Sequence, residues 1–288
     1  MEEIVAELLL DTAGDSVKLL PFLLVTYILM ELLEHHAGGR TKKRIYHAGK
    51  AGPLWGGLLG IVPQCGFSAS ASGLYAGRVI TVGTLLAIYL STSDEMLPVL
   101  ISGGVPAATI AKILAAKALI AVSSGFFAEF VYVKLLKRQE EEMDIHAVCE
   151  EEHCHCEDGV FLSAVKHTLR IFLYIFLLSL LLNVAIGAAG REALSGLFSG
   201  VPVVGEIIAA LVGLIPNCAS SVMITGLYLD GVIGPGAMMS GLLVNAGVGV
   251  LVLFKQNPDK RQTAGIIAAL YGLGVFWGVV IELTGITF

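Results

Sequence analysis

Residues 61–68 read IVPQCGFS, and residues 214–221 read LIPNCASS. Both stretches carry a proline, a side-chain amide, a cysteine and a serine in the same order and at the same spacing. Proline lacks a backbone N–H and clashes with the preceding turn, so it prevents a helix from continuing. Each stretch therefore predicts a break at which one helix ends and another begins.

The two stretches belong to a longer internal repeat. An offset of 153 residues aligns 58–95 with 211–248 and gives twelve identities. Chance similarity between apolar segments would produce scattered leucines and valines, whereas these identities include proline, cysteine, serine and a Gly-Leu-Tyr run. We therefore interpret the halves as repeats of one unit, with the identical pairs Leu58/Leu211, Gly60/Gly213, Pro63/Pro216, Cys65/Cys218, Ser68/Ser221, Gly73/Gly226, Leu74/Leu227, Tyr75/Tyr228, Val79/Val232, Ile80/Ile233, Gly83/Gly236 and Leu90/Leu243.

The composition defines the surroundings of the repeat. Only 15% of the 288 residues are charged, and the mean hydropathy is +0.81. Soluble domains carry about 25% charged residues, so this chain has too few polar side chains to cover a soluble protein of its size. This excludes a soluble enzyme, a disordered protein and a nucleic-acid-binding protein. We predict an integral membrane protein with the lipid bilayer, and no nucleic acid, as its partner.

Ten apolar segments are long enough to enter or cross a bilayer. A polar segment at 138–158 divides them, so we expect a first transmembrane repeat at 1–137, a loop at 138–158 and a second transmembrane repeat at 159–288. The apolar segments lie at 17–36, 51–64, 65–77, 79–104, 107–133, 160–188, 205–216, 217–229, 232–254 and 263–285.

The basic residues predict the orientation. Residues 40–50, 134–138 and 255–261 hold eleven of the eighteen lysines and arginines, so these loops are expected on the cytoplasmic side of a cytoplasmic (inner) membrane. The loops at 40–50 and 134–138 lie on the same side only if an even number of segments crosses the membrane between them, so either 51–77 or 79–104 must be re-entrant. Pro63 favours 51–77 as the re-entrant segment. We therefore predict an all-α, multi-pass protein with an inverted-topology repeat, six full spans and two re-entrant broken-helix hairpins.

The repeated break carries the first candidate site. A helix that starts at membrane depth offers free N–H groups and a positive dipole end, which favours an anion or a thiolate, and thiolates bind soft metals and metalloids. The alternative is that a buried cysteine acts as a small hydrophobic residue. The predicted substrate-binding residues are Pro63, Gln64, Cys65, Ser68, Pro216, Asn217, Cys218 and Ser221.

Two carboxylates lie midway along the segment 79–104. Charged groups inside a membrane are costly and usually mark an ion or proton pathway, so Asp94 and Glu95 are predicted to bind a coupling ion. The alternative is a buried ion pair with Lys117 in the next span. The second half has Gly247 and Val248 at the equivalent positions, so the charge occurs only once.

Two further groups have the composition of metal sites. Glu31 and His35 share one helix face at a spacing of four, although a polar helix end facing lipid headgroups is an equal alternative. The cytoplasmic loop has six histidines and cysteines within eleven residues, which is typical of metal binding, whereas a solvated acidic linker would not need them. These predicted ligands of a zinc-like or soft metal are His146, Cys149, His153, Cys154, His155 and Cys156.

Three motifs resemble a family of ten-transmembrane heavy-metal exporters, whose members are described as arsenic efflux proteins or manganese transporters. These motifs are GxxPQCGFSxxxSxLY at 60–75, LSTSDE at 90–95 and GLIPNCAxSVxxTxLYLxG at 213–231. The resemblance covers most of the chain. It implies efflux of a toxic metal or metalloid.

The leading hypothesis is a secondary-active exporter of an arsenite-like metalloid or a soft metal, driven by protons through Asp94. A manganese exporter would use the oxygen atoms of Asp94, Glu95, Gln64 and Asn217 instead, and a membrane-embedded metal sensor or scaffold would use the loop 138–158. The chain has no G-x-x-x-x-G-K-[ST] or H-E-x-x-H motif, so we expect neither enzymatic activity nor a required cofactor. A metal ion is expected as substrate or regulatory ligand. A homodimer is possible, and the sequence does not decide the oligomeric state.

Overall fold

The computed structural model describes residues 14, 17, 20–21, 23–29, 51–62, 65–93, 95–132, 160–189 and 203–288. These residues form helices joined by short turns and contain no strand, which confirms the all-α prediction for this part of the chain. The helices are α3 Gly52–Leu59, α4 Cys65–Ala76, α5 Val82–Ser91, α6 Met96–Ser102, α7 Ala107–Phe130, α9 Val160–Ala189, α11 Val204–Gly213, α12 Cys218–Leu229, α13 Pro235–Val244, α14 Gly249–Gln256 and α15 Lys260–Thr284.

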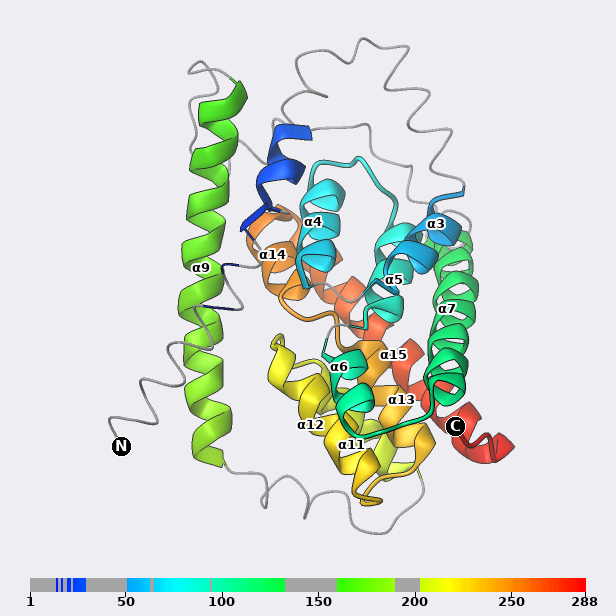
Figure 1. The fold of residues 1–288 in the computed structure, drawn as a ribbon. Coiled ribbons are helices and arrows are strands. Elements are labelled where there is room, and N and C mark those ends of the chain that lie inside the picture. Colours follow the sequence, from blue (N-terminus) through cyan, green and yellow to red (C-terminus); the bar gives the residue numbers. More distant parts are fainter. Residues whose placement is uncertain are drawn as a thin grey trace.

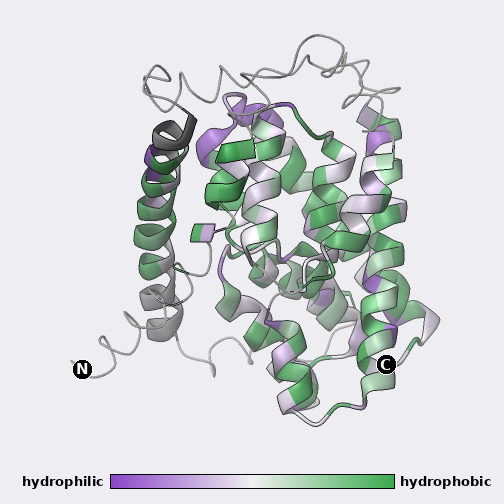
Figure 2. Cartoon of the chain, turned by 45° about the horizontal axis from the view of Figure 1, so that its top comes forward, coloured by the Kyte–Doolittle hydropathy of each residue, from purple (hydrophilic) through white to green (hydrophobic). Residues whose placement is uncertain are grey.

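Among the residues that the structure describes, five stretches are long and apolar enough to cross a membrane, as a helical multi-pass membrane protein requires. They are Val82–Ser102, Ala107–Phe130, Ala164–Leu181, Pro235–Gln256 and Lys260–Thr284. Figure 2 shows apolar residues along most of the long helices, with hydrophilic residues gathered near one end. Half of the predicted first span, 17–36, lies outside the described residues, and the residues described within it, 17, 20–21 and 23–29, are helical.

Helix α9 has one buried and one exposed face. Ala164, Thr168, Ile171 and Ile175 are buried at the three- and four-residue spacing of a helix, against the residues around Leu23 and against α14. Leucines on the opposite face are more than half exposed, which suits contact with lipid. These exposed residues are Leu169, Leu173, Leu177 and Leu181.

The helix boundaries of the two halves correspond at the same offset of 153 residues. Helices α4 and α5 match α12 and α13 residue for residue, and α6 and α7 begin at the positions equivalent to the starts of α14 and α15. The correspondence extends past the aligned segment 58–95 into the long helices α7 and α15. Seven further identities lie in these helices, and one of them pairs Glu129 with Glu282.

These two glutamates perform the same task. The Oε2 atom of Glu129 accepts a hydrogen bond of 2.8 Å from the backbone N–H of Gly83, and Oε2 of Glu282 accepts one of 3.1 Å from Gly236. Gly83 and Gly236 lie in the first turns of α5 and α13, where backbone N–H groups lack partners within the helix. Each long helix therefore fixes the beginning of the helix beside it.

The segments 79–104 and 232–254 differ from the prediction because each is interrupted near its middle. Residues 92–95 separate α5 from α6, and residues 245–248 separate α13 from α14. Serine and threonine hydroxyls bond back to the end of α5, whereas Gly247 adopts a φ of +53°. Apolar residues continue on both sides of each break, so periodicity alone does not reveal it.

The two halves exchange packing partners. Helix α4 packs against α14 of the other half, and α12 packs against α6. Figure 1 shows α3, α4, α5 and α14 near one end of the molecule and α6, α11, α12 and α13 near the other, while α7 and α9 run between the ends. The halves therefore interlock at the helix breaks.

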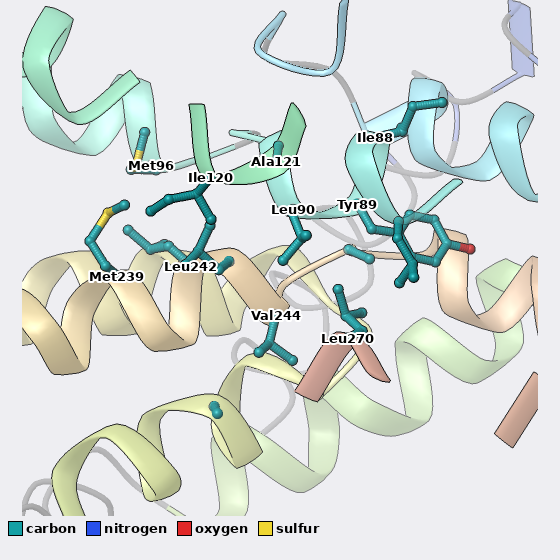
Figure 3. Close-up of a cluster of buried hydrophobic side chains, with 14 of the residues drawn as sticks. Ile88, Tyr89, Leu90, Met96, Ile120, Ala121, Met239, Leu242, Val244 and Leu270 are labelled. Carbon is teal, nitrogen blue, oxygen red and sulfur yellow. The ribbon is translucent and has the colours of Figure 1, made fainter. Parts of the chain in front are cut away.

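Buried side chains from both halves fill the centre. Figure 3 shows Leu90 of α5, Ile120 of α7, Leu242 of α13 and Leu270 of α15 within one cluster, with Met96 of α6 at its side. Their close packing holds the broken helices in place.

Candidate functional site

The N-terminus of α12 has the structure that its sequence predicts. Asn217 is the N-cap residue, and its Oδ1 accepts a hydrogen bond of 3.3 Å from the backbone N–H of Ala219. Pro216 directly precedes this cap, and Cys218 is the first helical residue, 8% exposed. In the other half α4 likewise begins at Cys65.

The second break is held by an asparagine. Asn245 ends α13; its Nδ2 donates to Oγ of Ser220 at 2.8 Å, and its Oδ1 accepts from the backbone N–H of Gly247 at 2.9 Å. These bonds join the break in α13–α14 to the first turn of α12. The arrangement satisfies polar groups that would otherwise be costly in an apolar interior.

A lysine links the two broken helices. Lys117 of α7 is fully buried, and its Nζ donates hydrogen bonds to the backbone oxygen of Thr92 and, at 3.0 Å, to that of Leu242. Thr92 follows the last residue of α5, and Leu242 lies in the last turn of α13. One ammonium group therefore bonds to the C-terminal ends of two helices, one from each half.

A small cavity lies at this junction. Its wall combines hydroxyl, amide and ammonium groups with a thioether and an isobutyl side chain, and both halves contribute. The lining residues are Thr92, Ser93, Met96, Lys117, Ser221, Leu242 and Asn245.

A tyrosine occupies the position in the first half that is equivalent to the cavity-lining Leu242. Tyr89 stands where the second half has Leu242, and its hydroxyl lies 2.6 Å from Oγ of Ser72 and donates to the backbone oxygen of Gly249 at 3.2 Å. The Ser72 hydroxyl also bonds to this oxygen, at 2.7 Å. The Tyr89 side chain is thus bonded into the core at the position where the second half has the cavity-lining Leu242.

The predicted site residues have different outcomes. Ser221 lines the cavity, while Ser68 is fully buried close to Gly249, at the start of α14. Glu95, partly buried, precedes α6, and neither Glu95 nor Cys218 is on the cavity wall.

The remaining predicted residues lie outside the described part of the chain, or only their backbone is described. Cys65 is helical, but its side chain is among those left undescribed. Within the described residues, no group of three or more His, Cys, Asp or Glu side chains forms a metal site. The predictions outside the description concern Pro63, Gln64, Asp94, Glu31, His35, His146, Cys149, His153, Cys154, His155 and Cys156.

Sequence reasoning missed Asn245 and Tyr89 and treated Lys117 only as a partner for carboxylates. Lys117 and Asn245 could have been singled out as functional candidates from the sequence, because placing a charged or polar side chain inside an apolar membrane segment costs free energy. Their roles depend on the breaks in α5–α6 and α13–α14, which bring backbone oxygens to the centre.

Comparisons with protein-family models, curated proteins and solved structures find no match to this chain. The resemblance to heavy-metal exporters therefore stays a prediction from the sequence motifs.

Proposed function

We propose that the chain is a secondary-active exporter of a heavy metal or metalloid, built as an inverted repeat. Helices α3 and α4 have 8 and 12 residues. At about 1.5 Å per residue, neither crosses a hydrocarbon core of about 30 Å. The same holds for α11 and α12, which lie near the opposite end in Figure 1. The two pairs act as hairpins that enter the membrane from opposite sides.

The observation that carries the proposal is the cavity at the helix breaks. Transporters with inverted repeats bind their substrate where discontinuous helices from the two repeats meet. Here the wall includes Thr92 from one half and Asn245 and Ser221 from the other. A rocking motion of one half against the other would open such a cavity first to one side and then to the other. A metal sensor has no need of this arrangement.

The charges support an orientation in the inner membrane. Arg78 follows α4, while Lys255 and Lys260 flank the turn between α14 and α15. These helix ends lie near the same end of the molecule in Figure 1. Because cytoplasmic loops are enriched in lysine and arginine, this is the cytoplasmic end.

The cavity favours a neutral, hydroxylated metalloid. Hydroxyl and amide groups of Ser93, Ser221 and Asn245 exchange hydrogen bonds with hydroxyl groups of a substrate, whereas the Lys117 ammonium repels a divalent cation. Arsenous acid has this chemistry. The thiol of Cys218 begins the same helix, one turn before Ser221, and supplies a soft ligand along the path.

Manganese export is the second candidate. Mn²⁺ prefers oxygen ligands, and the side chains of Thr92, Ser93 and Asn245 offer oxygen atoms on the cavity wall. In this case Asp94 and Glu95 must offset the positive charge of Lys117. The thiols then have no role.

Transport into everted membrane vesicles with a set pH gradient tests the proposal. We expect uptake of arsenite, and Asp94→Asn to abolish its dependence on the gradient. Ser221→Ala removes a hydroxyl from the cavity, so we expect KM to rise roughly fivefold, as the loss of one hydrogen bond implies.

Ser240→Ala is the matched control, because the Ser240 hydroxyl bonds to the backbone oxygen of Glu206, away from the cavity. We expect its KM to be unchanged. Uptake of Mn²⁺ without arsenite would favour the second candidate, and no gradient-dependent uptake of either would contradict both.

A further inference from the structure

Two backbone oxygens at the centre face one cation. The oxygens of Thr92 and Leu242 both accept hydrogen bonds from Nζ of Lys117. The lysine is fully buried, and so is the backbone around it, because Leu242 is 1% exposed and Thr92 is 4% exposed. The ammonium is therefore part of the core of the protein.

The helix breaks create these acceptors. The last four carbonyl groups of a helix have no partner within it, and the C-terminal end of the helix dipole is negative. Here the ends of α5 and α13 converge on the same point. In a membrane interior such oxygens need a partner, and unwound carbonyls and half-helix C-terminal ends are the groups that hold monovalent cations in transporters.

We infer that these oxygens form a site for a monovalent cation, which the Lys117 ammonium fills, and that Na⁺ or K⁺ binds there when the ammonium is removed. The inference concerns the ion and not the exported substrate, so it stands apart from the proposed function. The backbone oxygens of Thr92 and Leu242 are carbonyl ligands of the kind that hold monovalent cations in transporters. The space left by the shortened side chain adjoins the cavity lined by Ser93 and Asn245 and would admit water to complete the coordination.

The repeat supplies a comparison within the same chain. The residue equivalent to Lys117 is Leu270 of α15, which is also fully buried. The place equivalent to Leu242 holds Tyr89, whose own hydroxyl bonds to a backbone oxygen. Leu270→Ala therefore makes a cavity at a similarly buried position, which holds an apolar side chain and no cation in the wild type.

Thermal unfolding of the purified full chain in detergent tests the inference. The variants Lys117→Ala, Lys117→Met and Leu270→Ala are compared with wild type in NaCl, KCl and choline chloride at equal ionic strength. We expect Lys117→Ala to unfold at a temperature higher by roughly 3–6 °C in saturating NaCl or KCl than in choline chloride, because an ion that binds only the folded state stabilises it.

Wild type, Leu270→Ala and Lys117→Met are expected to show no such difference, since the methionine side chain occupies the space without a charge. If Lys117→Ala does not fold in choline chloride, Lys117→Ser, which keeps an oxygen at the site, carries the same comparison. Equal unfolding temperatures of the alanine variant in the three salts would overturn the inference. An equal rise of the unfolding temperature in Leu270→Ala or Lys117→Met would also overturn it. So would failure of both Lys117→Ala and Lys117→Ser to fold in NaCl.

Discussion

Cys65 and Cys218 are the first residues of α4 and α12. Each therefore stands where a helix has free N–H groups and a positive dipole end. If the two thiols bind one soft substrate, replacing either with serine removes a ligand at nearly constant volume. We expect arsenite export by each single variant to fall at least tenfold. The double variant should be little worse, because residues that act as a unit are non-additive.

Manganese export predicts the reverse ranking for the same variants. Both serine variants would then transport normally, and Asp94→Asn would abolish transport. Vesicle uptake at matched protein levels distinguishes the two cases. Normal arsenite export by both serine variants would show that the thiols have no part in binding.

Close helix crossings at glycine support the broken helices. A Cβ atom on Gly278 of α15 would lie 2.8 Å from the backbone oxygen of Gly236 in α13, and one on Gly125 of α7 would lie 2.7 Å from that of Gly83 in α5. These two pairs occupy equivalent positions at the offset of 153 residues. We expect Gly278→Ala to lower the free energy of unfolding by about 1–3 kcal/mol, because overpacking forces the helices apart.

Gly272 of the same helix is the control, because a Cβ atom there meets nothing within 4 Å. Gly272→Ala should be neutral or stabilise the protein by up to about 1 kcal/mol through helix propensity. Unfolding in detergent by heat or denaturant gives both values. A loss in Gly272→Ala as large as in Gly278→Ala would point to a general intolerance of alanine rather than to the crossing.

Most helices were predictable because proline, glycine and charge mark their ends. The start of α12 after Asn217 follows from its amide, which caps the helix. The interruptions at 92–95 and 245–248 were not predictable from apolar periodicity, because the hydrophobic residues resume directly after each one. The cavity depends on both interruptions and on the contact of α12 with α6, so no single segment of the sequence contains it.

The helix ends beside the described basic residues Arg78, Lys255 and Lys260 lie near one end of the molecule (Figure 1). The loop 138–158 connects the halves and is predicted at the cytoplasmic end, where metal enters an exporter. Deleting 146–157 should weaken metal resistance at low metal concentration and leave export intact at high concentration, because a capture site raises the local supply of substrate. Growth assays at graded arsenite concentrations measure this. Complete loss of export with normal expression would make the loop part of the transport path.

The orientation of the whole molecule is the last prediction. The excess of basic residues and the two hairpins predict that the turns after α6 and α12 face outward, together with both ends of the printed sequence. The turn before α15 and the loop 138–158 should face the cytoplasm. We expect a membrane-impermeant maleimide to label Ser102→Cys and Asp230→Cys in intact cells and to reach Arg261→Cys only after permeabilisation, in a chain whose five native cysteines are replaced. All three sites are exposed in the structure. Labelling of Ser102→Cys and Arg261→Cys from the same side would contradict the number of crossings between them. Labelling of Arg261→Cys alone in intact cells would reverse the orientation and, with it, the direction of export.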